Sequence, residues 1–130
     1  MIKYGYTILY VKNVVETALF YENAFGFSQK FVTTEKDYAE MVTGETTLAF
    51  ASITLGESNI KKGFIPSTIT NKPFGIEIVF ITDSVQTTID TAVKAGASIE
   101  AEPIEKPWGQ TVGYVRDING FLIEICTPLN

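Results

Sequence analysis

The sequence predicts an α+β protein made of two tandem modules, each with the element order βαβββ. The first observation is a repeat, because the segment TILYVKN at 7–13 resembles EIVFITD at 77–83. Both segments are apolar runs rich in β-branched and aromatic residues, which is typical of strands. The second observation is that a helix-start signal follows each run and a glycine ends each helical stretch. Shorter strand patterns then complete each half of the chain, so both halves follow one plan.

The predicted helices cover 14–24 and 84–95, and each has a start and a stop signal. An acceptor side chain precedes each helix and stands three residues before Glu or Gln, which is the spacing of a capping box. The two pairs are Asn13 with Glu16 and Asp83 with Gln86. Gly26 and Gly96 stand where a left-handed residue commonly ends a helix. We therefore expect both helices to be bounded by local signals.

Each predicted helix is followed by further strand candidates. They lie at 27–34, 37–43 and 46–53 in the first half, and at 98–103, 110–116 and 121–127 in the second. The last two strands of each half are joined by a turn that contains glycine, as in a hairpin. Between the halves, the segment 55–72 is rich in Gly, Ser, Asn, Lys and Pro, which indicates a linker. We expect a single domain over 1–130, with modules at 1–54 and 73–130.

Composition narrows the classes of function. A chain of 130 residues with 45% hydrophobic and 19% charged residues is large and apolar enough to form a compact core. The net charge is −5 and no segment is strongly basic, which argues against nucleic acid as a partner. No apolar stretch is long enough to span a membrane, and the first residues lack the pattern of a signal peptide. We therefore expect a cytoplasmic protein without a membrane or nucleic-acid partner.

The chain contains no histidine, and this absence removes several kinds of active site. Ser-His-Asp and Cys-His nucleophile pairs cannot form. Zinc and iron sites that need imidazole ligands are excluded as well. The side chain best suited to proton transfer near neutral pH is also missing. Cys126 is the only cysteine, so it cannot form an internal disulfide, and nothing near it in the sequence would favour a thiolate.

Four segments together resemble a known family. They are ILYVKNVVETALFYENAFGF, DYAEMVTGETTLAFAS, TTIDTAVKAGA and PWGQTVGYVRDINGFLIEI. With them the chain resembles, over nearly its whole length, the vicinal oxygen chelate superfamily, which includes glyoxalases, extradiol dioxygenases and bleomycin-resistance proteins. The resemblance implies the glyoxalase/bleomycin-resistance fold, in which curved mixed sheets enclose a cleft. It also implies a homodimer, because many members of this size are homodimers.

The resemblance also points to four positions in the cleft. In metal-using members each module supplies one ligand from its first strand, usually His, and one from its last strand, usually Glu. Carried onto this sequence, the first-strand positions are Tyr6 and Glu77, and the last-strand positions are Ala49 and Glu124. Two carboxylates without imidazole would hold a hard cation only together with several waters. We therefore expect neither a metal ion nor another cofactor.

The alternation of side chains along a strand indicates where the two glutamates point. The apolar residues at 76, 78 and 80 share one face of their strand, and Glu77 lies on the other. The helix must cover the wholly apolar face, because a lone carboxylate beneath it would have no partner. The same reasoning applies to the last strand, where Glu124 alternates with Ile123 and Ile125. We therefore expect both glutamates on the cleft side of the sheet.

Aromatic residues near these positions suggest a pocket. Tyr6 and Tyr10 would share the cleft face of the first strand, and the small Ala49 would leave room on the facing strand. Trp108, in a Pro-Trp-Gly turn, could cover a flat ligand or a cation. Packing in the core or at an interface would explain each of these residues as well. For Tyr10 and Trp108 we weight ligand binding and packing equally.

Two residues of the segment GYVRDING have simpler interpretations. Asp117 is expected to form the turn beside Asn119 and Gly120. Arg116 could hold an anionic group of a substrate, but a surface ion pair is the interpretation that we favour.

These observations leave three functions open. The first is a metal-independent protein that binds or sequesters a cationic or aromatic small molecule in an acidic, aromatic-lined cleft. Its ligand-binding residues would be Tyr6, Tyr10, Ala49, Glu77, Trp108 and Glu124. The second is a glyoxalase-like lyase or isomerase with Glu77 and Glu124 as acid and base. The third is a structural or regulatory dimer whose cleft is vestigial.

Overall fold

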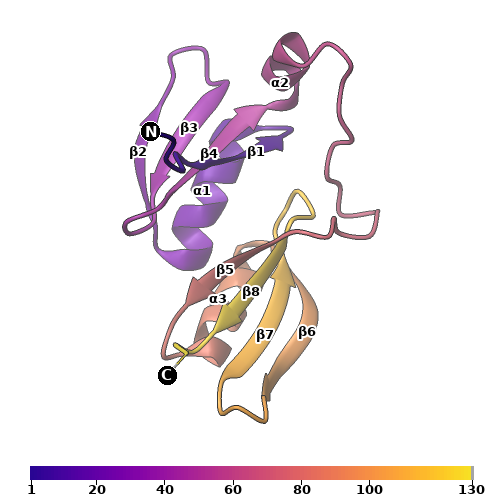
Figure 1. The fold of residues 1–130 in the computed structure, drawn as a ribbon. Coiled ribbons are helices and arrows are strands. Elements are labelled where there is room, and N and C mark those ends of the chain that lie inside the picture. Colours follow the sequence, from indigo (N-terminus) through magenta and orange to yellow (C-terminus); the bar gives the residue numbers. More distant parts are fainter. Residues whose placement is uncertain (130) are drawn as a thin grey trace. The chain divides into compact units, whose positions relative to one another are not determined.

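The computed structural model describes residues 1–129, and it confirms the predicted α+β class with two four-stranded mixed sheets and three helices (Figure 1). The chain forms two compact units. The first covers Met1–Glu22 and Gly26–Pro66, and the second covers Asn23–Phe25 and the chain from Ser67 onward. Each unit contains one of the two sheets. Within residues 1–129 no helix is both long and apolar enough to cross a membrane.

The first unit contains the sheet with strand order β1-β4-β3-β2. Its elements are β1 (Thr7–Val11), α1 (Val14–Phe25), β2 (Ser28–Val32), β3 (Tyr38–Val42), β4 (Thr47–Ser52) and α2 (Ile53–Asn59). β1 runs parallel to β4, and the other neighbouring strands are antiparallel. The strands and α1 therefore agree with the ranges expected from the sequence, whereas α2 was not expected.

The second unit repeats this plan with strand order β5-β8-β7-β6, drawn in orange and yellow in Figure 1. Its elements are β5 (Glu77–Ile81), α3 (Val85–Ala95), β6 (Ser98–Glu105), β7 (Thr111–Arg116) and β8 (Leu122–Cys126). β5 runs parallel to β8, and the remaining pairs are antiparallel. The element order and the pairing match those of the first unit, so the predicted βαβββ repeat is confirmed.

The helix signals are confirmed for α1 and wrong at one point for α3. The Asn13 side chain accepts a hydrogen bond of 2.9 Å from the backbone N–H of Glu16, as the capping box requires. α3 is preceded by Ser84 rather than Asp83, and no side chain caps it. The reason is that the Thr82 hydroxyl accepts from the backbone N–H of Ser84, which shifts the start of the helix by one residue.

The segment 55–72, which the sequence predicts to be a linker between the modules, begins within α2. Its first part belongs to α2, whose start is fixed by the Ser52 hydroxyl accepting from the backbone N–H of Leu55 at 3.0 Å. Further on, Phe64 stacks on Tyr10 with 4.6 Å between the ring centroids. The capping residue Ser52 lies three residues before this segment, so the composition of 55–72 alone did not indicate the helix that runs into it.

The core of the second unit lies between α3 and the sheet. Ile89 of α3 and Ile123 and Ile125 of β8 are completely buried, and α3 packs against β6, β7 and β8. Burial of each such side chain contributes about 1.5–3 kcal/mol. Gly113 of β7 allows the close approach, because a Cβ atom there would lie 2.6 Å from the Ile89 side chain. The apolar face of β8 is thus the helix-covered face, as expected.

Candidate functional site

The two predicted glutamates lie on neighbouring strands and on the same face of their sheet. β5 is parallel to β8, with Glu77 opposite Leu122 and Val79 opposite Glu124. Two residues of offset keep the side chains on one face. Because Ile123 and Ile125 are buried beneath α3, Glu124 must point to the face that α3 does not cover. Glu77 is exposed and Glu124 is half-buried.

The neighbouring carboxyl group shifts the pKa of Glu77. A hydrogen bond with Glu124 is the largest cause that raises the pKa of Glu77 to about 7, and partial burial and the negative charge of Glu124 add to it. A carboxyl group that retains its proton near neutral pH can donate to a neighbouring carboxylate. Glu77 is therefore the protonated partner of this Glu77–Glu124 pair.

Glu124 is the ionised partner, because several donors surround it. Burial raises its pKa, but hydrogen bonds from Glu77, Cys126 and Tyr114 outweigh burial and lower the pKa below its ordinary value, and the positive charge of Lys106 acts in the same direction. The Tyr114 hydroxyl donates to Oε1 of Glu124 at 3.0 Å. A half-buried carboxylate with this many donors is held in one orientation.

Tyr114 was missed by sequence reasoning, because its place depends on the register of two strands. It stands directly opposite Glu124 in the antiparallel pairing of β7 with β8. Counting outward from Asn119 and Gly120 as a two-residue turn would have paired Glu124 with Val115 instead. Burial and the hydrogen bond to Glu124 raise the pKa of Tyr114 to about 12, so its hydroxyl stays protonated and acts as a donor.

Cys126 follows Glu124 by two residues and lies on the same strand. Burial raises the pKa of its thiol to about 11, and the hydrogen bond to Glu124 and the charge of that carboxylate add to the effect. At neutral pH the side chain is a thiol and not a thiolate, so it donates to Glu124 and is a poor nucleophile.

The predicted site residues of the first unit lie on the face of the sheet opposite α1, and they differ in accessibility. Tyr6 is half-exposed. Tyr10 is engaged in stacking on Phe64, and its ring also approaches the backbone of Gly56. Ala49 is completely buried and stands opposite Glu40 in the sheet. Tyr6 therefore offers the most accessible side chain of the three.

The first unit contains a second pair of Tyr and Glu that the sequence did not single out. The Tyr38 hydroxyl donates to Oε2 of Glu40 at 2.7 Å, and Nζ of Lys30 lies 3.7 Å from Oε1 of the same carboxylate. Burial raises the pKa of Tyr38 well above its ordinary value, and contacts with Glu40 and Tyr6 add to the shift. Because Lys30 already neutralises Glu40, this pair attracts a cation less than Glu124 does.

Trp108 lies in the turn between β6 and β7 and is 64% exposed. Its indole N–H donates to Oε1 of Gln110 at 2.9 Å. The ring lines a pocket of about 370 Å³ in the second unit, and neither Glu77 nor Glu124 lines that pocket. Trp108 therefore lines a pocket that does not include the Glu77–Glu124 pair.

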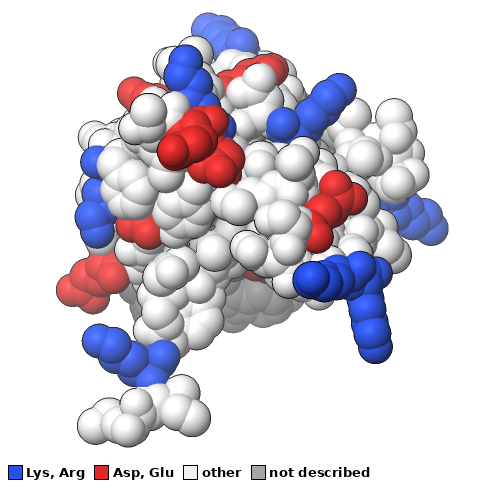
Figure 2. Space-filling model, turned by 90° about the horizontal axis from the view of Figure 1, so that it is seen from above, with Lys and Arg blue, Asp and Glu red and all other residues white. Residues whose placement is uncertain are grey.

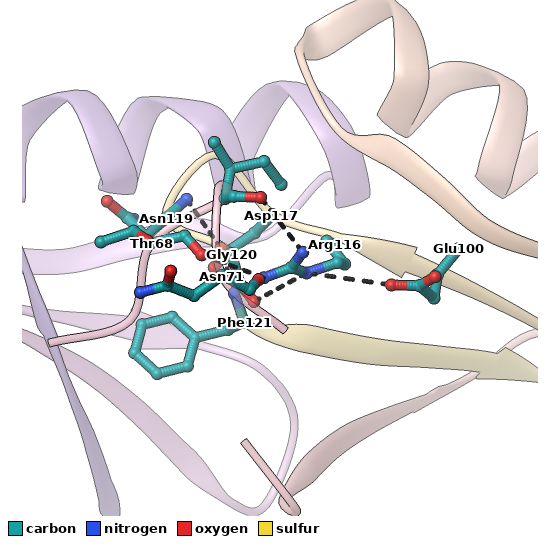
Figure 3. Close-up of polar contacts among 9 residues, drawn as sticks. Thr68, Asn71, Glu100, Arg116, Asp117, Asn119, Gly120 and Phe121 are labelled. Carbon is teal, nitrogen blue, oxygen red and sulfur yellow. Dashed lines mark hydrogen bonds and ion pairs between the residues drawn. The ribbon is translucent and has the colours of Figure 1, made fainter. Parts of the chain in front are cut away.

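Arg116 is buried and serves the fold, so the favoured interpretation as a surface ion pair is wrong. Figure 3 shows its guanidinium group directed at backbone carbonyl groups. It donates to the carbonyl oxygens of Thr68, Ile69, Asn71 and Gly120 at 2.7–3.2 Å. Glu100 is 4.0 Å away and partly exposed, so that ion pair is weak. The guanidinium group thus fastens the segment 68–71 to the β7–β8 turn.

Asp117 forms the predicted turn. Its Oδ1 atom accepts hydrogen bonds from the backbone N–H groups of Asn119 and Phe121 at 2.8 and 2.9 Å. The Asp117 side chain is completely buried, so its carboxylate needs hydrogen-bond donors inside the protein, and these two backbone N–H groups supply them.

With the fold and these side chains defined, the relation to known proteins can be stated. A family model described as the Glyoxalase/Bleomycin resistance protein/Dioxygenase superfamily matches residues 3–125. The chain belongs to this superfamily. The family inferred from four sequence segments is thereby confirmed. No curated protein is similar enough in sequence to count as a match.

Solved structures of low sequence identity have the same fold. A glyoxalase-related enzyme from Fulvimarina pelagi is 18% identical with a TM-score of 0.83, and the alignment covers 98% of this chain and 89% of that one. A glyoxalase/bleomycin resistance protein/dioxygenase family enzyme from Burkholderia phytofirmans PsJN is 17% identical with a TM-score of 0.77, covering 95% and 96% of the two chains. A virulence protein from Salmonella typhimurium is 25% identical with a TM-score of 0.63, covering 98% and 97%. These similarities establish the fold and leave ligand and reaction open.

The side chains at the four superfamily positions do not fit the metal centre that metal-using members have. Ala49 has no ligand atom, and Tyr6 replaces the usual imidazole. Within residues 1–129 no three His, Cys, Asp or Glu side chains are grouped so that they could hold a metal ion. The remaining two, Glu77 and Glu124, are a pair of carboxyl groups on neighbouring strands with no imidazole beside them. The chemistry of this site therefore has to be sought in the carboxyl pair itself.

Proposed function

We propose that this chain is a metal-independent binding protein of the superfamily that holds a small cationic or aromatic molecule against the Glu77–Glu124 pair. The observation that carries the proposal is the placement of the half-buried Glu124, hydrogen-bonded by Tyr114, and the exposed Glu77 on neighbouring strands and on the face of the sheet opposite α3. A cation with N–H donors can replace the proton of Glu77 and bond to both carboxylates at once. Tyr114 keeps Glu124 oriented toward such a ligand.

The charge distribution supports a cationic ligand. The chain carries a net charge of −5. On the face drawn in Figure 2, acidic and basic side chains are interspersed and do not gather into one broad basic area. Phosphate backbones need clustered Lys and Arg, so a small molecule suits this surface better than nucleic acid does.

The proposal is tested by thermal unfolding in the presence of benzamidinium, a planar cation with N–H donors. A ligand that binds only the folded chain raises the melting temperature as its concentration rises. Saturable stabilisation is expected for benzamidinium and not for benzamide, its neutral isostere. The variant Glu124→Gln should lose the effect, whereas Glu102→Gln, which removes an exposed charge from β6, should keep it. If no member of a panel of cationic aromatic compounds stabilises the protein, the proposal is wrong.

A second function, a glyoxalase-like lyase or isomerase, is favoured by one observation. The pKa of Glu77 near 7 beside an ionised Glu124 gives an acid and a base in contact at neutral pH. Such a pair could move a proton at a carbon next to a carbonyl group, with the Tyr114 hydroxyl as an additional donor. Proton exchange into small ketones and hemithioacetals in D₂O, followed by NMR, tests this function. Exchange that is lost in both Glu77→Gln and Glu124→Gln supports it, and no exchange above the buffer rate contradicts it.

We carry forward two expectations as part of the proposal: a homodimer, which the superfamily implies, and a cytoplasmic location, which the sequence pattern suggests. Sedimentation equilibrium checks the homodimer, because the monomer has a mass of 14.3 kDa. A mass about twice that value at micromolar concentration supports the dimer, and a monomer mass at high concentration contradicts it.

A further inference from the structure

A recess outside the Glu77–Glu124 pair lies where β5 and β8 end and β7 begins. It measures about 370 Å³, and the residues that matter for its chemistry are Asp83, Trp108, Gln110, Thr111, Thr127 and Leu129. All of them belong to the second unit, so the recess forms within one compact part of the chain. Its volume falls at the lower end of the range of small-molecule sites, roughly 300–1,000 Å³.

Hydrogen bonds among the lining residues hold the polar wall of this recess in place. The indole N–H of Trp108 donates to Gln110, whose Nε2 donates in turn to the backbone carbonyl of Thr127 at 2.8 Å. The backbone N–H of Thr111 donates to the Thr127 hydroxyl at 3.0 Å. The indole N–H, one Nε2 hydrogen of Gln110 and the backbone N–H of Thr111 are therefore not available to an anionic ligand.

Asp83 gives the recess its charge. Its carboxylate is exposed and has no hydrogen bond or ion pair with any other part of the described chain. Within residues 1–129 no Lys or Arg lines the recess. The sequence pattern predicted that Asp83 caps α3. In the structure Ser84 is the residue before the helix, so Asp83 does not cap it.

The indole ring of Trp108 supplies the second attraction. Its N–H is held by Gln110 in the plane of the ring, and the side chain remains 64% exposed, so ring surface is open to a ligand. The face of an indole ring attracts cations more strongly than other aromatic rings do. Leu129 adds apolar surface that is 74% exposed.

We propose that this recess binds a small organic ammonium ion, with its nitrogen held by the Asp83 carboxylate and its apolar part against Trp108. The combination of the Asp83 carboxylate, an open indole ring and a lining to which residues 1–129 contribute no Lys or Arg selects a cation over an anion or a neutral molecule. The start of α3 would favour an anion, but its backbone N–H groups lie at residues that do not line the recess. This site is separate from the Glu77–Glu124 pair and does not depend on the function proposed for that pair.

The protein contains a single tryptophan, so the fluorescence of Trp108 reports directly on this recess. The probes are benzylammonium, benzyl alcohol and benzoate, which share one ring and differ in charge at neutral pH. Saturable quenching is expected for benzylammonium alone, after correction for collisional quenching measured on N-acetyltryptophanamide. Equal quenching by benzyl alcohol, preferential quenching by benzoate, or no saturable quenching would overturn the inference.

Variants separate this site from the other one. Asp83→Asn should weaken benzylammonium binding about fivefold, the effect of an exposed ion pair. It should fold normally, because Asp83 makes no contact that the fold needs. Glu102→Gln removes the same charge from β6 and should leave binding unchanged, as should Glu124→Gln. Unchanged binding in Asp83→Asn would contradict the inference, and a loss in Glu124→Gln would mean that the ligand occupies the Glu77–Glu124 pair.

Discussion

At the scale of single residues, the account depends on how a proton is distributed between two glutamates. Glu124 receives hydrogen bonds from Tyr114, Cys126 and Glu77, so it remains ionised. Glu77 is more exposed and has Glu124 as its main neighbour, so it retains the proton. The opposite shifts of the two pKa values thus follow from the number of donors around each carboxyl group.

The raised pKa of Glu77 predicts a pH dependence of stability. Between its ordinary pKa of about 4.3 and the folded value of about 7, the unfolded chain releases the Glu77 proton and the folded chain keeps it. The free energy of unfolding of the wild type should therefore fall with rising pH in this window, relative to Glu77→Gln. Urea unfolding at several pH values from 4 to 8 measures the difference. A difference that is constant with pH would contradict the assignment, and Glu102→Gln, which removes an exposed charge from β6, serves as the control.

At the scale of elements, two segments of the predicted linker are held by packing that the sequence alone does not reveal. The segment 68–71 is fastened by Arg116, whose partners stand more than 40 residues away along the chain. α2 is fixed against β1, where Tyr10 and Phe64 surround Gly56. Both contacts are long-range, which explains why local composition failed to predict them.

Gly120 is predicted to be far less tolerant than another glycine of similar backbone geometry. Gly120 and Gly44 both have positive φ, at 89° and 104°. A Cβ atom at Gly120 would lie 2.4 Å from the carbonyl oxygen of Thr68, whereas nothing lies within 4 Å at Gly44. Gly44→Ala should cost about 1 kcal/mol from backbone strain alone. Gly120→Ala should cost at least about 3 kcal/mol, because it also displaces the segment that Arg116 binds.

Urea unfolding compares the two variants, and limited proteolysis of the segment 68–71 shows whether it has been released. Equal costs for both substitutions would contradict the role assigned to this turn.

Replacing Gly56 by alanine is predicted to destabilise the protein, which is the opposite of the usual effect of this substitution in a helix. Replacing glycine by alanine inside a helix normally stabilises it by about 1 kcal/mol. In α2 a Cβ atom at position 56 would come within 2.7 Å of the Tyr10 ring and 2.9 Å of Phe64. Gly56→Ala should therefore destabilise the protein by about 1–3 kcal/mol, measured by urea unfolding. Gly56→Ala that stabilises the chain would mean that α2 does not pack on Tyr10.

At the scale of the whole molecule, the repeated fold could be predicted from the sequence. Of the candidate site, the two glutamates could be predicted, but the residues around them could not. Periodicity and the glycines that end the helices indicated both βαβββ units, and the capping signal was correct for α1 alone, because each of these features depends on residues close in sequence. The alternation of side chains was also enough to orient Glu77 and Glu124. Tyr114 and the buried role of Arg116 were missed, because they depend on strand register and on distant backbone carbonyls. The superfamily positions indicated where to look, and the side chains found there determined what the site can do.

The most direct test of the central claim is a ¹³C NMR titration of the glutamate carboxyl groups, assigned with Glu77→Gln and Glu124→Gln. One carboxyl carbon, that of Glu77, should titrate near pH 7, and its midpoint should move toward about 4.3 when Glu124 is replaced. The carbon of Glu124 should titrate below its ordinary value. Independent titration of both groups near pH 4.3, unchanged by either substitution, would show that the pair does not share a proton and would contradict the proposed function of the site.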